Sequence, residues 1–292
     1  MRRSFKLKTE IRSLLQKHHS VIFYVSWFLL SILQAYFTGL QDDEAYYWVY
    51  SKFLSWGYFD HPPMIALLIK AGTIIFSGEL GVRVLIVILS TLTLIITEKL
   101  IEERNHILFY AICLSLPVLQ IAGFIAVPDI PLIFFTSLFF LAYRSFIHKQ
   151  SLTSSVLLGI AISGLLYSKY HGILVVFFVL LSNIKLLKRY SLYISGITAF
   201  LFFVPHLLWQ YHHDWISFKY HLFERNTEHY DVSVTFEYIL GQFLLIGPIA
   251  SIIFFVSTFF YKTKTSLEKA FQYTAVGIFI FFSKYLKGAG RS

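Results

Sequence analysis

An apolar run, Val21–Leu40 (VIFYVSWFLLSILQAYFTGL), is followed at once by the acidic stretch Gln41–Trp48 (QDDEAYYW). About twenty apolar residues are enough for a helix to cross the hydrocarbon core of a bilayer. The run follows a basic segment but has no small-residue cleavage site, so we interpret it as a retained anchor rather than a signal peptide. The sequence therefore predicts a membrane-spanning helix with acidic side chains just beyond its end.

The rest of the chain has the composition of a polytopic membrane protein. Of its 292 residues, 57% are hydrophobic and only 14% are charged. Apolar runs long enough to cross a bilayer recur from end to end, so we predict an all-α fold, a polytopic bundle of about nine transmembrane helices. The expected spans are 21–40, 80–100, 106–125, 129–147, 152–168, 172–187, 191–209, 237–260 and 269–287. The single cysteine, Cys113, lies inside one of these runs, and one cysteine cannot build a disulfide framework.

The charged residues divide between the two sides that these spans define. With a cytoplasmic N-terminus, the inner segments hold 16 of the 25 Lys and Arg residues but only 5 of the 16 acids. This distribution follows the positive-inside rule. We therefore interpret the net charge of +9 as membrane topology and not as a surface for nucleic acid. The prediction is a multi-pass protein of the inner (plasma) membrane, in contact with membrane lipids, with its active face on the periplasmic or extracellular side.

The predicted organisation is one membrane domain with short additions. Residues 1–20 form a basic cytoplasmic N-terminus, and residues 21–287 form the transmembrane domain. Two outer loops, 41–79 and 210–236, carry acids, histidines and aromatic residues. The first loop is expected to contain interfacial helices, because its apolar segments are too short to span. Residues 288–292 form a tail at which the protein is expected to be truncated.

Acids begin three predicted helices on the outer side. Asp43 follows the first span between two further acids, Asp60 precedes a double proline, and Asp129 follows a proline in a very short connection. An acid at a helix start is often only a cap that suits the helix dipole. One acid would suffice for the first helix, whereas the sequence supplies three. We predict Asp43, Glu44 and Asp129 as catalytic carboxylates, and we expect Asp129, close to the interface, to have a partner.

Basic and aromatic residues on the same side complete the predicted site. Lys169 ends the fifth span, where it either snorkels to the headgroups or binds a lipid phosphate. In the second outer loop, Arg225 has the planar guanidinium that suits a bidentate phosphate contact. The residues predicted to bind substrate are Tyr46, Tyr58, His61, Lys169, Tyr170, His171 and Arg225.

A divalent metal ion is a further expectation. Asp60 supplies an oxygen ligand, and His221 in the second outer loop could add an imidazole. The competing interpretation is that Asp60 caps the helix after the prolines and that any single histidine is exposed and binds nothing. The candidate metal ligands are Asp60 and His221.

This set of residues suits chemistry on a phosphorylated lipid at the outer surface. A carboxylate can take the proton from an acceptor hydroxyl. Cations or a metal can stabilise the charge on a departing phosphate. The sequence therefore favours an enzyme that acts at the membrane surface.

The motifs also carry a resemblance to a known family. They are Asp43–Trp48 (DEAYYW), Gly57–Pro63 (GYFDHPP), Pro128-Asp129 and Lys169, of which the first two are specific and the others weak alone. In this order and spacing, from about residue 20 to residue 287, the chain resembles the GT-C fold membrane glycosyltransferases of glycosyltransferase family 39. Within them it is most similar to the dolichyl-phosphate-mannose protein mannosyltransferase-like bacterial members, to which the aminoarabinose transferase of lipid A is related.

The resemblance implies a transferase that moves a hexose or pentose from a polyprenyl-phosphate donor to a lipid, glycan or protein acceptor at the outer face. It implies that Asp43 acts on the acceptor with Glu44 beside it. It also implies a metal-ligand position at Asp60 and a basic position at Lys169. His61 departs from the pattern, because the lipid A relative has lysine there. Members of the family usually extend well beyond the length of this chain.

Two other interpretations stay open. A transporter or flippase for lipid-linked sugars usually has ionisable residues or broken helices near the bilayer midplane. The middles of the predicted spans carry no Asp, Glu, Lys or Arg, which favours surface chemistry. The other alternative is an inactive, truncated homologue that binds lipid or a partner chain.

Overall fold

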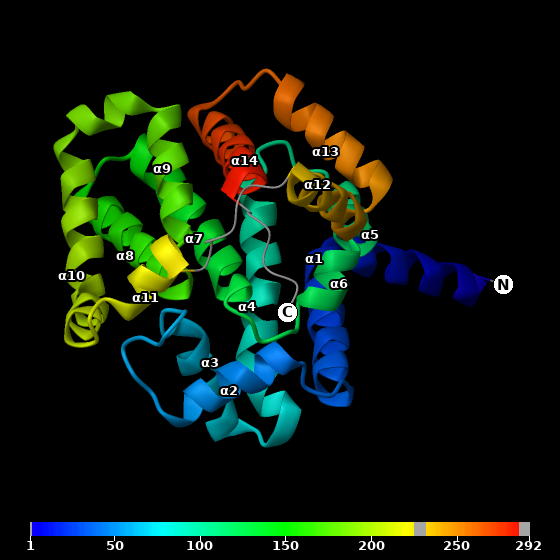
Figure 1. Ribbon diagram of the computed structural model, residues 1–292. Coiled ribbons are helices and arrows are strands. Elements are labelled where there is room, and N and C mark those ends of the chain that lie inside the picture. Colours follow the sequence, from blue (N-terminus) through cyan, green and yellow to red (C-terminus); the bar gives the residue numbers. More distant parts are fainter. Residues whose placement is uncertain (1, 225–231, 286–292) are drawn as a thin grey trace.

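The computed structural model describes residues 2–224 and 232–285, and every regular element within them is a helix (Figure 1). The predicted all-α class is therefore confirmed for this part of the chain. The elements are α1 (Arg2–Phe37), α2 (Asp42–Lys52), α3 (Met64–Ile75), α4 (Gly78–Leu100), α5 (His106–Ser115), α6 (Pro117–Ala122), α7 (Asp129–His148), α8 (Leu152–Ser168), α9 (Gly172–Ser182), the 3₁₀ helix η1 (Ile184–Lys188), α10 (Tyr190–His212), α11 (Ile216–Lys219), the π-helix η2 (Tyr220–Glu224), α12 (Val232–Ile246), α13 (Pro248–Phe260) and α14 (Ser266–Tyr285).

The long helices alternate in direction, so the bundle has two distinct ends. At one end, which we call the site end, α1 finishes, α4 begins, and α2 and α3 lie close by (Figure 1). The start of α7 and the finish of α8 meet at this end too, because the Lys169 side chain contacts Asp129. The two short helices expected within 41–79 are present as α2 and α3.

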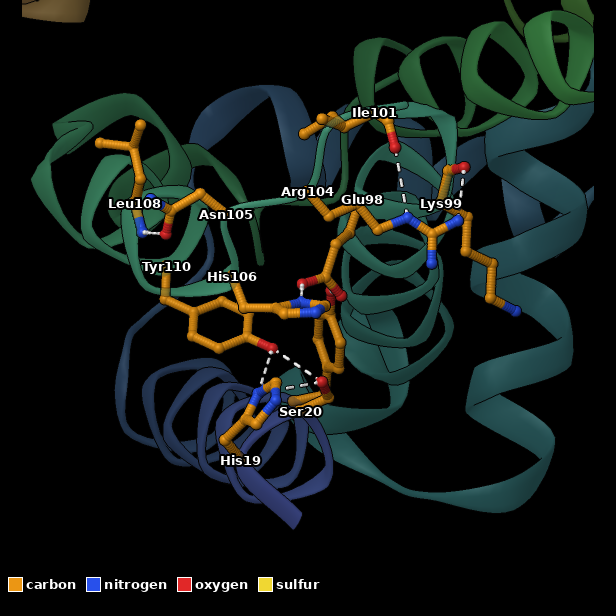
Figure 2. A network of polar contacts seen from close by, with 11 residues as sticks. His19, Ser20, Glu98, Lys99, Ile101, Arg104, Asn105, His106, Leu108 and Tyr110 are labelled. Atoms are coloured by element: carbon orange, nitrogen blue, oxygen red, sulfur yellow. Dashed lines mark hydrogen bonds and ion pairs between the residues drawn. The ribbon is translucent and has the colours of Figure 1, made fainter. Parts of the chain in front are cut away.

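The opposite end is closed by a polar network between α1, α4 and α5 (Figure 2). The Tyr24 hydroxyl donates to Glu98 Oε2 at 2.6 Å, and Glu98 Oε1 lies 2.7 Å from His106 Nδ1. The Tyr110 hydroxyl donates to Ser20 Oγ at 2.8 Å. These contacts hold α1 and the start of α5 against the last turn of α4, away from the acids of the site end.

The largest apolar core lies among α7, α8, α9, α10 and α14, with α8 packed between α7 and α10. Small residues allow this close approach: a Cβ atom added to Gly164 would lie 2.2 Å from the Phe135 ring of α7, and one at Gly159 would lie 2.6 Å from the Ser195 carbonyl of α10. Such packing stabilises helix pairs in lipid, where hydrophobic association adds little. A smaller core at the site end contains Tyr47, Ile65, Ile69, Val82, Ile86, Ala126 and Ile130.

The predicted number of nine spans is not confirmed. Within the described residues, four helices are long and apolar enough to cross a membrane, at His18–Phe37, Gly78–Leu100, Asp129–His148 and Tyr190–His212. The pair α12 and α13 would add a fifth only if it counted as one span, and it bends by 111°. The structure therefore shows a helical membrane protein with fewer full-length spans than the apolar runs suggested.

Local breaks explain three of the differences. Pro117 has no amide hydrogen to donate, so the predicted span 106–125 is divided between α5 and α6. Gly247 has a φ angle of +91°, which divides the span predicted at 237–260. Residues 172–187 form only the 11-residue α9 before the backbone changes at Asn183 and continues as η1.

Candidate active site

The first turn of α2 presents two acids to the surface. Asp42 and Asp43 are exposed at the helix start, where the helix dipole favours negative charge. Asp43 makes no hydrogen bond or ion pair with any residue that the structure describes. Its carboxylate is therefore available to an incoming group.

The neighbouring acid, Glu44, is fully buried, and the catalytic role predicted for it needs correction. Both of its oxygens accept hydrogen bonds from the Arg83 guanidinium, one of them at 2.7 Å. The backbone N–H groups of Gln41 and Ala126 donate to the same carboxylate at 3.0 and 2.8 Å. Burial opposes ionisation of Glu44, but these donors outweigh it and lower its pKa. Glu44 is thus an ionised structural group without access to a substrate in this arrangement.

Asp60 lies in the segment between α2 and α3 and is held by aromatic hydroxyls. Tyr50 and Tyr46 donate to its Oδ1 at 2.9 and 3.2 Å, and His61 Nδ1 lies 2.9 Å from Oδ2. Burial raises the pKa of Asp60, but His61 and the two tyrosines have the larger combined effect and lower it. Tyr46 and His61, both predicted to bind substrate, therefore contact this carboxylate directly.

Asp129 forms an ion pair with Lys169, and the sequence predicted a partner for this acid without naming it. Lys169 Nζ lies 2.8 and 3.0 Å from the two carboxylate oxygens of Asp129. The acid begins α7, the lysine follows α8, and about half of the Asp129 side chain is exposed. The predicted partner of Asp129 is thus identified, and a cation stands at the surface of the site end.

Three aspartates affect the Tyr47 hydroxyl. Tyr47 is one of the buried residues of α2, and this burial raises the pKa of its hydroxyl. The negative charges of Asp60, Asp43 and Asp129 each raise that pKa further. Three carboxylates from separate stretches of the chain are therefore near enough to affect the ionisation of one hydroxyl.

Tyr58, predicted to bind substrate, instead holds the chain together. Its hydroxyl donates to the carbonyls of Tyr50 and Phe53 at 3.0 and 3.2 Å and accepts from the Ser55 N–H. Its ring is buried and stacks on Tyr50 with 4.0 Å between the centroids. Because both the hydroxyl and the ring are engaged, this prediction needs correction.

Tyr170 also has its hydroxyl inside the protein. It receives a 2.8 Å hydrogen bond from Gln210 and lies 3.0 Å from His206 Nε2. Gln210 also donates to Ser217 Oγ, which in turn donates to the Tyr58 carbonyl. We therefore revise the predicted role of the Tyr170 hydroxyl: it joins α10 to the end of α8 and to the segment before α3.

An apolar hollow lies beside two of the predicted substrate-binding residues. His171 and Tyr170 line this hollow, which has a volume of 320 Å³, together with Leu166, Phe203, Phe218 and Leu222. Arg225, the predicted phosphate clamp, lies outside the described residues.

Both residues predicted to hold a metal ion are engaged in other contacts. His221 Nε2 lies 2.6 Å from the Asp60 carbonyl, which can only accept, so this nitrogen carries the proton and cannot be a ligand. The Asp60 carboxylate is already occupied by Tyr46, Tyr50 and His61. In the part of the chain that the structure describes, no three His, Cys, Asp or Glu side chains are grouped for a metal.

Comparison with known proteins adds the family. Residues 60–209, just over half of the 292-residue chain, match the model of the dolichyl-phosphate-mannose-protein mannosyltransferase family. The chain belongs to this family. The resemblance inferred from the motifs is confirmed, and the protein is a member of a family of membrane glycosyltransferases. The matched region contains Asp60, Asp129 and Lys169 and begins after Asp43.

A curated relative supports this family assignment. Lipid A galacturonosyltransferase RgtD of Rhizobium johnstonii is 26% identical over 220 residues, which cover 71% of this chain and 46% of the relative. The chain therefore spans about half the length of that protein. No solved structure matches the chain significantly.

Sequence reasoning missed several residues that build the site of this family member. Contacts that hold the predicted residues in place come from Arg83, Tyr47, Tyr50, His206 and Gln210. Arg83 could have been found, because a charge just inside an apolar span is costly and calls for a partner. The tyrosines carried no signal in a chain with 19 of them.

Proposed function

We propose that this protein transfers a sugar from a polyprenyl-phosphate donor to a hydroxyl or phosphate of a lipid, glycan or protein acceptor. The observation that carries the proposal is the ion pair of Lys169 with Asp129 at the end of the bundle where Asp43 is exposed. The site end thus holds a carboxylate without a partner among the described residues and a half-buried cation. The family assignment supports sugar transfer as the reaction.

Asp43 is the proposed base. Its carboxylate accepts the proton of the acceptor hydroxyl while the acceptor oxygen attacks the anomeric carbon of the sugar. The bond between that carbon and the donor phosphate oxygen breaks, and the electron pair leaves with the phosphate. Lys169, held by Asp129, stabilises the resulting negative charge. Charge balance is kept, because the proton moves to Asp43 and the leaving group departs as a phosphate anion.

The apolar hollow offers a place for the prenyl chain. It lies between α8, α9, α10 and α14, beside Tyr170, and Tyr170 directly follows Lys169. Its aliphatic and aromatic lining suits a hydrocarbon chain, and its 320 Å³ is within the usual range of ligand pockets. A donor lying there would bring its phosphate towards the lysine.

The proposed location follows from the charges. The basic segments between the spans support an N-terminus in the cytoplasm and a site end on the outer side of the inner membrane. Acids, aromatic residues and one lysine at the site end suit an acceptor that arrives from the aqueous side.

The test is sugar transfer by Asp43→Asn in membranes, with Asp42→Asn as the matched control. General base catalysis contributes about 10²–10⁴-fold, so Asp43→Asn should reduce transfer by at least about 100-fold. Asp42, exposed in the same turn, should be dispensable. Mass spectrometry of lipid-linked and surface glycans measures the product. Undiminished transfer by Asp43→Asn would remove the base assignment.

A further inference from the structure

The buried pair of Arg83 and Glu44 uses every hydrogen of the guanidinium. Arg83 Nε donates to Glu44 Oε1 at 2.7 Å, and Nη2 donates to Oε2 and to the Gly39 carbonyl at 2.8 Å. Nη1 donates to the carbonyls of Ala35 and Thr38 at 3.1 and 2.5 Å. A guanidinium has five N–H donors in a fixed plane, and all five are used. The orientation of the side chain is therefore set by two stretches of the protein, residues 35–39 and the start of α2.

The carboxylate of the pair extends these contacts to a third stretch, just before α7. Glu44 accepts from the N–H of Gln41, which precedes α2, and from the N–H of Ala126, which precedes α7. Asp43 is the residue before Glu44, and Asp129 lies three residues after Ala126. Both side chains of the pair are completely buried, so water does not compete for these hydrogen bonds.

We propose that Arg83 and Glu44 are positioning residues that set the distance between Asp43 and the Asp129–Lys169 ion pair. This inference rests on the proposed function, because it assigns those groups to the two ends of one transfer reaction. Displacement of a reacting group by about 1 Å can cost about 10²-fold in rate. The Glu44 carboxylate fixes the starts of both α2 and α7. The pair would therefore control the distance between Asp43 and the Asp129–Lys169 ion pair directly.

Two variants keep both charges and change only the geometry. Glu44→Asp retains the ion pair but shortens the connection between α2 and the Ala126 N–H by one methylene. Arg83→Lys retains the cation but cannot bind both carboxylate oxygens and three carbonyls at once. Arg144→Lys is the control, since Arg144 donates to the Lys99 carbonyl at the opposite end of the bundle.

The experiment measures steady-state transfer per folded molecule, together with amide hydrogen exchange in residues 41–47 and 124–130. For Glu44→Asp and Arg83→Lys we expect kcat to fall about 10–100-fold while KM for the donor stays within about twofold. Exchange should accelerate in both segments together, although they are far apart in the sequence. Arg144→Lys should match wild type in every measurement.

The outcomes separate this inference from the proposed function. Wild-type kcat per folded molecule in either variant would overturn the inference, as would complete failure of both variants to fold, because the pair would then serve stability alone. If wild-type protein transfers no sugar, the proposed function fails. In that case, coupled exchange in the two segments would still show that the pair joins them.

Discussion

At the scale of single residues, neighbouring acids have different environments. Asp43 and Glu44 are adjacent at the start of α2, but successive helical residues point about 100° apart. Glu44 faces the bundle and binds Arg83, whereas Asp43 faces outward. Asp60 is intermediate, with hydroxyl donors from two tyrosines. A buried carboxylate needs donors to stay ionised, so the number of donors distinguishes the acids that hold structure from the acid that is available to react.

We predict that Tyr50→Phe lowers stability by about 1–3 kcal/mol at pH 7, because it removes a 2.9 Å hydrogen bond to ionised Asp60. The pKa of Asp60 is lowered in the folded protein. A lowered pKa contributes stability that is present above the unfolded-state pKa and is lost as the pH falls through the folded-state pKa. The difference between Tyr50→Phe and wild type should therefore shrink below about pH 4. Thermal unfolding of the purified proteins at pH 7 and pH 3 measures it.

The control for this prediction is Tyr193→Phe. The Tyr193 hydroxyl donates to the Leu187 carbonyl, which does not titrate, so the effect of that substitution should not depend on pH. A second control is Tyr50→Phe in an Asp60→Asn background, where the effect at pH 7 should be much smaller. Equal destabilisation by Tyr50→Phe at both pH values would contradict the assignment.

At the scale of elements, the segment between α2 and α3 is attached to α10 and α11 through buried polar groups. His206 Nδ1 lies 2.6 Å from the Trp56 carbonyl, and Ser217 Oγ donates to the Tyr58 carbonyl at 2.5 Å. Gly57 lies between these two attachment points and packs against the Trp209 ring. Because Asp60 follows a few residues later, the position of this segment on α10 decides where that carboxylate lies.

We predict that Gly57→Ala destabilises the protein by about 1–3 kcal/mol, because the added Cβ atom would lie 2.4 Å from the Trp209 ring. Trp209 cannot easily move, since it stacks on His213 with 4.1 Å between the ring centroids. Gly196→Ala in α10 is the matched control, because nothing lies within 4 Å of its added Cβ atom. Thermal unfolding in detergent compares the two variants, and equal stability would show that the contact with Trp209 relaxes without loss.

At the scale of the whole molecule, the two ends of the bundle differ in chemistry. The site end gathers three aspartates and Lys169, and the opposite end holds the Glu98 and His106 network shown in Figure 2. Helices that alternate in direction produce this separation, because side chains at the start of one helix meet those at the finish of its neighbour. A reaction at the site end would therefore face a single side of the membrane.

We predict that a membrane-impermeant maleimide added to spheroplasts labels Lys52→Cys at the site end but not Glu103→Cys at the opposite end. Both positions are exposed. Wild-type protein provides the blank, because Cys113 is buried. Permeabilised membranes should allow labelling at both positions. The reverse pattern in spheroplasts would invert the proposed topology.

The sequence by itself determined the fold class and the family. Those inferences depend on the length of the apolar runs, on the side of the membrane at which the charged residues are expected, and on short motifs. Run length and motifs are local features of the sequence, and the side follows from the alternation of the predicted spans. The expected pairing of Asp129 with a partner could also be predicted, because a carboxylate close to lipid needs one. The nine spans suggested by run length are not confirmed within the described residues, where Pro117 and Gly247 divide apolar stretches that composition alone joins.

Only the tertiary structure showed which of the adjacent acids, Asp43 or Glu44, has no hydrogen bond or ion pair with the described residues. Whether Asp43 or Glu44 meets Arg83 depends on how α4 packs beside the start of α2, and no pattern within either segment records that packing. The same holds for Tyr58 and Tyr170, whose hydroxyls find their partners on elements distant in the sequence. The burial of a side chain and its hydrogen bonds depend on several segments of the chain at once. For that reason, only the assembled structure distinguishes a side chain that holds the fold together from one that is available to react.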